Sequence, residues 1–167
     1  KENEVVNLNK QIQERSNLND RQTIINNVST MFENILEDFK FPKLENAYIS
    51  PDNYLPYVRG RKYSELGSLG AVTLITMAYY ISILLQTTDN TMYNHLNLLM
   101  IDTPRKNLGA TSTTEEFRDE EIYNSIIKNF INIGNELSDK VQLIIINNGY
   151  PNFLPDEDLI VEFSSNG

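Results

Sequence analysis

The segment NLLMIDTPRKNLG, residues 97–109, decides the fold that we expect from this sequence. An apolar run leads to a single aspartate, Asp102, and then to a polar turn that contains Pro104. Continuous apolar runs of this length are typical of parallel strands that are buried on both faces. Ligands of open α/β folds bind at the carboxyl ends of such strands. The segment therefore predicts a buried strand that presents the Asp102 carboxylate at the edge of a sheet.

A second apolar run, VQLIIINNG at residues 141–149, has the same form and also ends in polar residues. A helical pattern over residues 115–137 separates the two runs, and the acidic residues in its first turns suit the positive end of a helix dipole. A strand, a crossover helix and a parallel strand form a right-handed βαβ unit. The sequence therefore predicts an α/β fold in which Asp102 and Asn148 meet at one carboxyl edge.

Residues 1–39 have a helical pattern with apolar residues at steps of three and four. A polar gap at residues 16–22 interrupts the apolar positions, so we expect the first part of the helix to project and the second part to pack on the domain. Pro42 is predicted to end the helix. The projecting part is either one arm of a coiled coil or an amphipathic surface helix, because two heptads are too few to establish a coiled coil.

Residues 47–50 and 54–58 are predicted to form a β-hairpin around a turn at residues 51–53. Pro56 has no N–H donor, so the second strand is expected at a sheet edge or at a bulge. Residues 158–163 are a further candidate for a short strand.

A turn containing Ser68 and Gly70 leads directly into an apolar run at residues 71–85. The run is apolar on nearly all sides, so it predicts a central helix that is covered on most faces. Ser68 has two interpretations. It caps the helix, or it binds an anionic oxygen together with the N–H groups of the first helical turn.

A chain of 167 residues with 40% apolar residues is long enough for one domain with a sizeable core. Its formal charge of -9 argues against binding to duplex DNA or a membrane surface by this chain alone, because no net positive field is available. The chain contains no cysteine, which excludes disulfides and thiolate metal sites. The negative net charge still allows a local basic patch, and the candidate residues for one are Lys40, Lys43, Arg59, Arg61 and Lys62.

The amino terminus is charged and polar, unlike a secretory signal, and the apolar run at residues 71–85 is shorter than a membrane span. We therefore expect a cytoplasmic chain with no membrane partner. Because the sequence begins at Lys1 rather than at a methionine, we also expect it to be a piece of a longer protein.

Three features follow one another along the chain: a serine-glycine turn before an apolar helix, an apolar strand that ends in Asp-Thr-Pro, and an apolar strand that ends in Asn-Asn-Gly. This order resembles the carboxyl-terminal lobe of the ABC-type ATPase heads of the SMC and RecN class. The signature turn of that family reads roughly Leu-Ser-Gly-Gly, and residues 67–70 read GSLG. Its Walker B strand ends Asp-Glu-Pro-x-x-Asn-Leu-Asp, and residues 102–109 read DTPRKNLG, with four matching residues at the same spacing.

The resemblance extends over about residues 1–163. It implies that residues 40–167 are the carboxyl-terminal lobe of a P-loop NTPase, with a parallel βαβ core and a preceding β-hairpin, and that residues 1–39 return from a coiled-coil arm. It also implies ATP and Mg²⁺ as cofactors, with Asp102 positioning the ion. The resemblance implies that the nucleotide is also contacted from three other places. These are the signature turn, the loop that crosses between two heads and the position where the family has a phosphate-sensing histidine. These residues are Ser68, Gly70, Asn107, Gly109 and Asn148.

The chain departs from the family pattern at three positions. Thr103 replaces the glutamate that orients the attacking water, Gly109 replaces the final aspartate of the loop, and Asn148 replaces the histidine. Asp102, Thr103 and Asn148 thus occupy the catalytic positions, but threonine is no carboxylate base. Hydrolysis is therefore slow, uses another carboxylate such as Glu115 or Glu116, or is absent.

No Gly-x-x-x-x-Gly-Lys-Ser/Thr motif occurs in the sequence. In the family this phosphate-binding loop belongs to an amino-terminal lobe, so the resemblance implies that the chain binds and hydrolyses ATP only with that lobe, between two dimerised heads. Family members act on DNA in repair, chromosome maintenance or defence. Two alternatives are open: a non-catalytic head fragment that dimerises or docks a partner, and an unrelated α/β domain in which Asp102 only caps the following turn.

Overall fold

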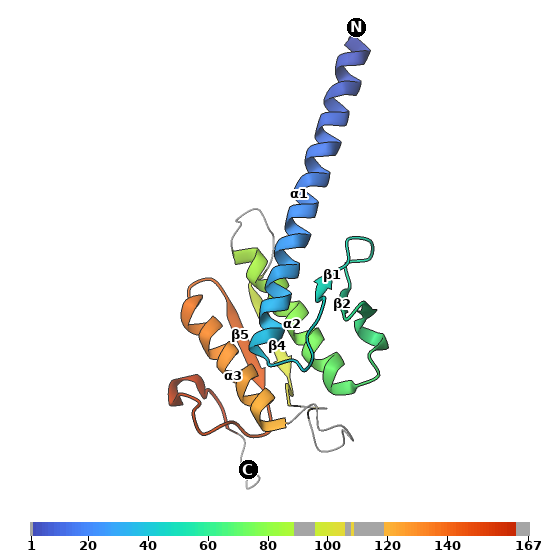
Figure 1. Cartoon of the computed structure of the whole chain (residues 1–167). Helices are drawn as coiled ribbons and strands as arrows, with labels where there is room; N and C mark the ends of the chain where they lie inside the picture. Colours follow the sequence, from blue (N-terminus) through green and yellow to red (C-terminus); the bar gives the residue numbers. More distant parts are fainter. Residues whose placement is uncertain (1, 89–95, 106–107, 109–118, 163–167) are drawn as a thin grey trace.

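The computed structural model of the chain describes residues 2–88, 96–105, 108 and 119–162 (Figure 1). Helices and strands are mixed, with one parallel two-stranded sheet and one small antiparallel sheet. The elements in chain order are α1 Glu2–Asp38, β1 Tyr48–Ile49, β2 Pro56–Val58, β3 Arg61–Lys62, the 3₁₀ turn η1 Tyr63–Glu65, α2 Leu69–Thr88, β4 Leu98–Asp102, α3 Asp119–Glu136, β5 Gln142–Ile146 and the 3₁₀ turn η2 Asp156–Asp158.

β4 and β5 form the predicted parallel pair. Leu98 lies opposite Gln142 at one end of the ladder, and Asp102 lies opposite Ile146 at the other. α3 precedes β5 in the chain and packs against it, so the strand, helix and strand form the expected βαβ unit. The predicted start of this helix at residue 115 lies outside the described residues.

Only one face of the β4–β5 sheet is packed. On the other face, Met100 is 58% exposed and Ile146 is 49% exposed. The expectation that these strands are buried on both faces is therefore wrong. The physical reason is that α2 and α3 cover a single face, and no third strand pairs with either edge among the residues described. The side chains of the packed face are Leu99, Ile101, Leu143 and Ile145.

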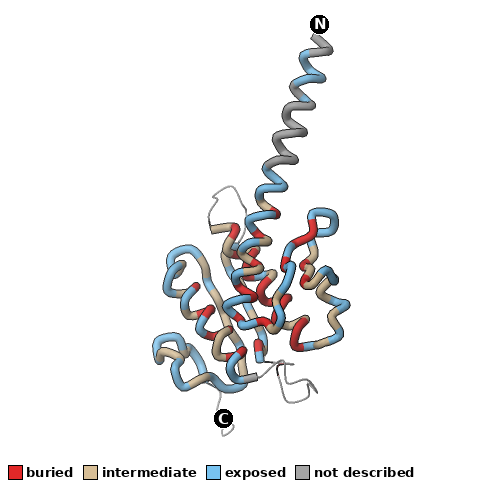
Figure 2. Tube along the Cα trace, viewed as in Figure 1, coloured by how far each residue is buried: buried red, intermediate tan, exposed pale blue. Residues whose placement is uncertain are grey.

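The hydrophobic core lies where the carboxyl-terminal half of α1 meets α2 and α3, and Figure 2 shows the buried residues gathered there. Each helix contributes apolar side chains at steps of three and four, which is the spacing of one helical face. Completely buried examples are Phe32 and Leu36 of α1, Leu74 of α2 and Ile126 of α3. α2 also packs against β4, so the core supports the strand that carries Asp102.

The amino-terminal half of α1 extends away from the rest of the molecule (Figure 1). Val5 and Leu8 are exposed, and Ile25 is the first buried residue among the positions of the helix whose burial the structure describes. The polar gap in the sequence therefore marks the change from the projecting part to the packed part. This confirms the expectation that the first part of the helix projects.

α1 ends before Pro42. A left-handed turn ends the helix, rather than the proline as predicted. The N–H of Phe41 donates to the carbonyl of Leu36 (2.9 Å), and the N–H of Lys40 donates to that of Glu37 (2.8 Å). Lys40 has a φ of 57°, so these bonds form the left-handed helix ending in which glycine is the usual residue. Pro42 follows this ending, where a proline cannot continue the helix.

Two polar contacts fix this end of α1 to α3. The Asn129 side-chain amide donates to the Asp38 carboxylate over 2.9 Å, and Lys40 forms an ion pair with Glu121. Asn129 is buried, and a buried polar group is costly unless it is hydrogen-bonded. The Asn129–Asp38 contact therefore favours one alignment of the two helices.

The antiparallel sheet has the order β1–β2–β3. β2 is thus the central strand, which corrects the prediction that the strand of Pro56 lies at a sheet edge. Pro56 pairs only with Ile49 of β1, whereas β3 pairs with Tyr57 and Val58. The proline is tolerated because it is the first residue of its strand and lies beyond the end of β3.

α2 is the predicted central helix, and ten of its residues are buried. With 20 residues it is longer than the run seen in the sequence, and by length and composition alone it could cross a membrane. The apolar run at residues 71–85 is shorter than a membrane span, as predicted, but the helix that contains it is not. Half of the apolar window is buried inside the structure, as in the core helix of a folded domain.

The predicted strand at residues 158–163 is not formed in its described part, residues 158–162. Asp156–Asp158 instead form the 3₁₀ turn η2, and the N–H of Leu159 donates to the carbonyl of Asp156 (3.2 Å). Ile160 and Val161 are exposed, so the apolar residues of this segment do not have the packed face that a strand requires.

Phe39 is fully buried, and its ring packs edge-on against Phe130 with 6.3 Å between the centroids. Phe39→Ala is expected to lower the free energy of unfolding by about 3–5 kcal/mol, because it removes a buried ring and leaves a cavity. Val6→Ala, at an exposed position of the projecting part, is the control and should change it by less than about 0.5 kcal/mol. Urea denaturation followed by circular dichroism measures both, and similar losses would contradict this location of the core.

Candidate functional site

The carboxyl ends of β4 and β5 lie at the end of the molecule opposite the projecting half of α1, and the amino ends of α2 and α3 lie at the same end (Figure 1). The helices run antiparallel to the strands that they cover, so the amino ends of the helices lie beside the carboxyl ends of the strands. The carboxyl edge of a parallel sheet is where α/β proteins bind ligands. Asp102, the last residue of β4, is the charged residue at this edge that the sequence predicts as functional.

Thr103 connects Asp102 to β5. Its hydroxyl donates to the Oδ1 atom of Asp102 (2.7 Å), and its backbone N–H donates to the carbonyl of Ile146 (2.6 Å). The first bond fixes one oxygen of the Asp102 carboxylate, and the second continues the pairing of the strands beyond β4. Thr103 therefore orients the carboxylate, which differs from the role of a catalytic base.

Thr103 has a φ of 55°, in the left-handed region that β-branched residues rarely adopt. Such a conformation costs roughly 1–2 kcal/mol in a residue other than glycine. Strained residues often occur at functional sites, where the surrounding structure maintains them. Here the Ile146 carbonyl and the Asp102 carboxylate hold the strained residue in place.

Asn147, rather than the predicted Asn148, makes the polar contacts after β5. Its amide nitrogen donates to the Tyr123 hydroxyl (2.6 Å) and to the carbonyl of Gly149 (2.7 Å), whereas the Asn148 residue is exposed. The alternation of side chains along β5 could have identified Asn147, because it places residues 143, 145 and 147 on the packed side of the sheet. Asn147 and Asn148 thus occupy different environments.

Sequence reasoning also missed Tyr123 and Arg105. The Tyr123 hydroxyl donates to the carbonyl of Gly149 (3.3 Å), and its ring lies 5.1 Å from the Cζ atom of Arg105, measured to the centroid. Burial raises the pKa of Tyr123 above its ordinary value, although Arg105 and the hydrogen bond from Asn147 act in the opposite direction. α3 therefore brings the ring of Tyr123 to the sheet edge. No motif in the sequence indicates this ring.

Ser68 is the N-cap of α2. The N–H of Ala71 lies 3.4 Å from the Ser68 hydroxyl, which accepts it, and the N–H of Val72 donates to the Ser68 carbonyl (3.0 Å). Gly70 is buried in the first helical turn. This is the capping interpretation of Ser68, and no hydrogen bond links Ser68 to Asp102 or Thr103 in the part of the chain that the structure describes.

Four further residues of the predicted site lie outside the described residues: Asn107, Gly109, Glu115 and Glu116. Within the described ranges, no cluster of three or more histidine or acidic side chains could hold a metal ion. A single carboxylate such as Asp102 is nevertheless suited to Mg²⁺, which keeps several waters and takes its other oxygen ligands from bound phosphates. The described residues at this edge thus offer one carboxylate, which by itself is too few ligands for a metal ion held by protein alone.

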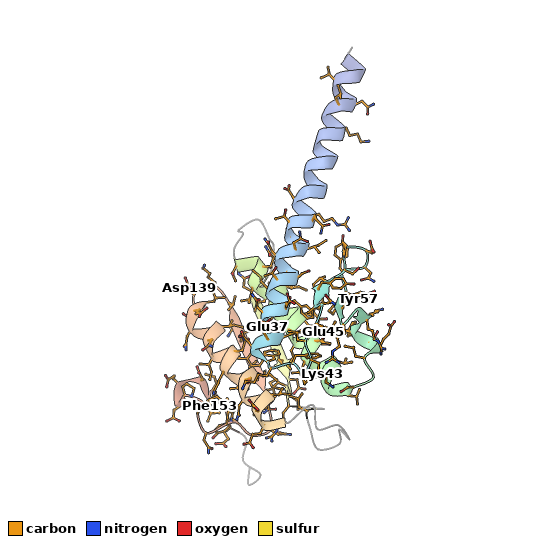
Figure 3. All side chains as sticks on the ribbon, in the orientation of Figure 1. Glu37, Lys43, Glu45, Tyr57, Asp139 and Phe153 are labelled. Atoms are coloured by element: carbon orange, nitrogen blue, oxygen red, sulfur yellow. The ribbon has the colours of Figure 1, made fainter. Side chains whose placement is uncertain are left out.

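The basic cluster suggested by the sequence is partly used in packing. Lys43 and Glu45 lie on the loop after α1 (Figure 3), where Arg59 donates to the carbonyls of Lys43 (2.7 Å) and Pro42. The backbone N–H of Arg59 donates to the carbonyl of Glu45 (2.8 Å). Arg59 therefore stabilises this loop.

An open apolar groove of about 370 Å³ lies elsewhere, between α1, α2 and β1. Ile24, Val28, Ile49 and Ile83 line much of it, and the charged lining residues are Asp20 and Arg21, whose Cζ atom lies 4.8 Å from the centroid of the Tyr54 ring. Binding sites for polar ligands need a few converging polar groups. The sheet edge, with Asp102, Thr103 and Arg105, has such groups, so we take the sheet edge as the candidate site.

The described residues define a mixed α/β protein whose polar site lies at the carboxyl edge of a parallel strand pair. Comparison of the sequence with protein-family models and with curated proteins finds no match. The functional interpretation therefore depends on the chemistry and geometry of this edge.

Thr103→Asn is expected to be more stable than Thr103→Val by about 0.5–1 kcal/mol, because both variants lose the hydroxyl bond to Asp102 but asparagine adopts positive φ more readily than a β-branched residue. Thr103→Val keeps the β-branch but removes the hydroxyl bond to Asp102, so it should not be stabilising. Urea denaturation of both variants tests the left-handed conformation, and a stabilised Val variant together with a destabilised Asn variant would contradict it.

The raised pKa of Tyr123 predicts a loss of stability at high pH. Folding favours the neutral phenol, so its contribution is intact below the unfolded pKa of about 10 and is lost as pH rises through the folded pKa. Tyr123→Phe should therefore make the free energy of unfolding decline less steeply than in the wild type above pH 10. Tyr150→Phe, at an exposed ring, is the matched control, and an equal change of slope in both variants would refute the role of Tyr123.

Proposed function

We propose that this chain is the carboxyl-terminal lobe of an SMC-like, ABC-type P-loop ATPase head, which binds and hydrolyses ATP with Mg²⁺ only together with an amino-terminal lobe. The observation that supports this most strongly is the incomplete parallel sheet that ends in Asp102. β4 and β5 have the form of core strands, but one of their faces is exposed.

Parallel sheets are normally covered on both faces, and a sheet of two strands is only marginally stable without further packing. The uncovered face of β4–β5 has Leu98, Met100 and Ile146 exposed on it, with the polar residues Gln142 and Asp102 at its two ends. No other strand satisfies the outer edges of the pair in the described part of the chain. An amino-terminal lobe that adds strands at these edges and packs on the uncovered face would bury apolar surface and bring the missing phosphate-binding loop to the carboxyl edge of the sheet.

In this proposal Asp102 supplies the carboxylate that positions Mg²⁺, which neutralises phosphate charge during the transfer when it is bound. Thr103 bonds to one oxygen of that carboxylate, and in this proposal the other oxygen would bind the ligand. Ser68 and Gly70, at the amino end of α2, would contact the nucleotide of a second head. The exposed apolar residues of α1 are consistent with a coiled-coil arm. Action on DNA in the cytoplasm, without a membrane partner, belongs to the same proposal.

A second candidate is a non-catalytic head fragment that dimerises or docks a partner. The observation that favours it is the hydroxyl of Thr103, which bonds to Asp102 at the position where the family carries a glutamate. A hydroxyl in this bond takes no proton from water as a carboxylate would. Such a head would still bind ATP and dimerise, without turnover.

The two candidates differ in ATP turnover. The coding region upstream of Lys1 is expected to encode a Gly-x-x-x-x-Gly-Lys-Ser/Thr motif followed by heptads, and the lobe with that motif is co-expressed with this chain. Asp102→Asn should reduce turnover by about 100-fold or more, because it removes the charge that positions the metal. Asp139→Asn, an exposed carboxylate at the opposite end of α3, should leave turnover unchanged.

ATP-dependent dimerisation without turnover would support the second candidate in place of the first. An upstream region without such a motif, or turnover that Asp102→Asn leaves intact, would reject the proposed ATPase site.

A further inference from the structure

We propose that Arg105, held over the ring of Tyr123, binds phosphate oxygens at the carboxyl edge of the β4–β5 sheet. The nature of the ligand, the phosphate chain of a nucleotide, rests on the proposed function. The capacity of Arg105 to bind phosphate rests on the geometry of its own surroundings.

Tyr123 provides a fixed surface for the guanidinium group. The Tyr123 residue is only 3% exposed, and its hydroxyl is bonded on two sides, to the Asn147 amide and to the Gly149 carbonyl. The Arg105 guanidinium lies within cation–π distance of the ring, whereas the residue as a whole is exposed. A guanidinium that rests on an aromatic ring keeps its in-plane N–H donors for a bidentate bond to an oxyanion.

The backbone around Arg105 is also anchored. Pro104 is fully buried, and the N–H of the buried Leu108 donates to the Arg105 carbonyl (3.1 Å). The side chain therefore starts from a fixed point next to the end of β4. Less conformational freedom is lost on binding when a charged group is held in this way.

Asp102 and Arg105 carry opposite charges three residues apart at the same edge, yet they form no ion pair in the structure as described. A carboxylate for a cation and a separate guanidinium for an anion suit a complex of Mg²⁺ with phosphate, which offers both charges. An ion pair between the two side chains would instead have used the charge of each.

The two other described arginine–aromatic pairs differ from this one. Arg59 lies over Phe41, and it donates to two backbone carbonyls of the loop after α1. Arg21 lies 4.8 Å from the ring centroid of Tyr54, but it is on α1 beside the apolar groove. Arg105 is the one of these three that lies beside a carboxylate at the sheet edge. Arg21 has the same charge and a similar ring contact, so it is a matched control.

Sodium tripolyphosphate at constant ionic strength is the probe, and NMR of the ¹⁵N-labelled chain is the measurement. The Nε–Hε signal of Arg105 and the backbone amides of Asp102, Thr103 and Arg105 should shift and saturate together. Arg105→Gln should weaken the affinity read from those amides by about tenfold or more, because a charge-assisted bidentate contact is lost. Arg21→Gln should leave the affinity unchanged.

Variants of Tyr123 test the ring separately. Tyr123→Leu should weaken binding several-fold, whereas Tyr123→Phe, which keeps the ring, should retain most of the affinity. Each of three results would overturn the proposal: no saturable shift up to about 20 mM probe, which is beyond the millimolar range of a weak specific site; wild-type affinity in Arg105→Gln; or equal losses in Arg105→Gln and Arg21→Gln, which indicate unspecific attraction.

The probe contains no adenosine and the chain is tested alone, so the result is independent of ATP turnover. Saturable binding through Arg105 in a chain whose reconstituted head hydrolyses no ATP would reject the first proposed function and keep the phosphate site. If turnover needs Asp102 but Arg105→Gln binds phosphate with wild-type affinity, the phosphate site is rejected and the first proposed function is kept.

Discussion

β4 and β5 run parallel, and parallel neighbours must be joined by a crossover, because a tight turn can join only antiparallel strands. α3 supplies that crossover, and its direction brings its amino end to the carboxyl ends of both strands. The site follows from this one constraint. Asp102 comes from the end of β4, Asn147 from the end of β5, and Tyr123 from the first turns of α3. The three residues are far apart in the sequence, and the parallel pairing gathers them at one edge.

The same pairing explains the uneven burial of the domain. The core is built from α1, α2, α3 and the inner face of the sheet, so the apolar residues of the outer face have no partner among the described elements. A parallel sheet usually has a layer of helices on each face, and here the described helices cover only one face. Polar residues over the whole outer face would suit a sheet that stays open to water, but the polar residues Gln142 and Asp102 lie only at its ends, and Met100 and Ile146 are exposed on it.

Much of this fold is predictable from periodicity, because the βαβ unit and the two parts of α1 each give a clear pattern. The errors have physical reasons. An apolar strand looks the same whether one or two layers cover it, so the sequence overstates the burial of β4 and β5. Lys40 ends α1 in a conformation usually reserved for glycine, which no propensity indicates. At the site, Asp102 is visible as a charge after an apolar run, whereas Arg105 and Tyr123 become partners only through the packing of α3.

The projecting part of α1 also has a mechanical consequence. The first 23 or so residues of the helix form a rod roughly 35 Å long at 1.5 Å per residue. Its base is continuous with the buried part of the same helix, which contacts both α2 and α3. A tilt of about 5° at the base therefore displaces the free end by roughly 3 Å, given a rod of that length. A small change in the packing of the core would therefore be a larger displacement at the far end of α1.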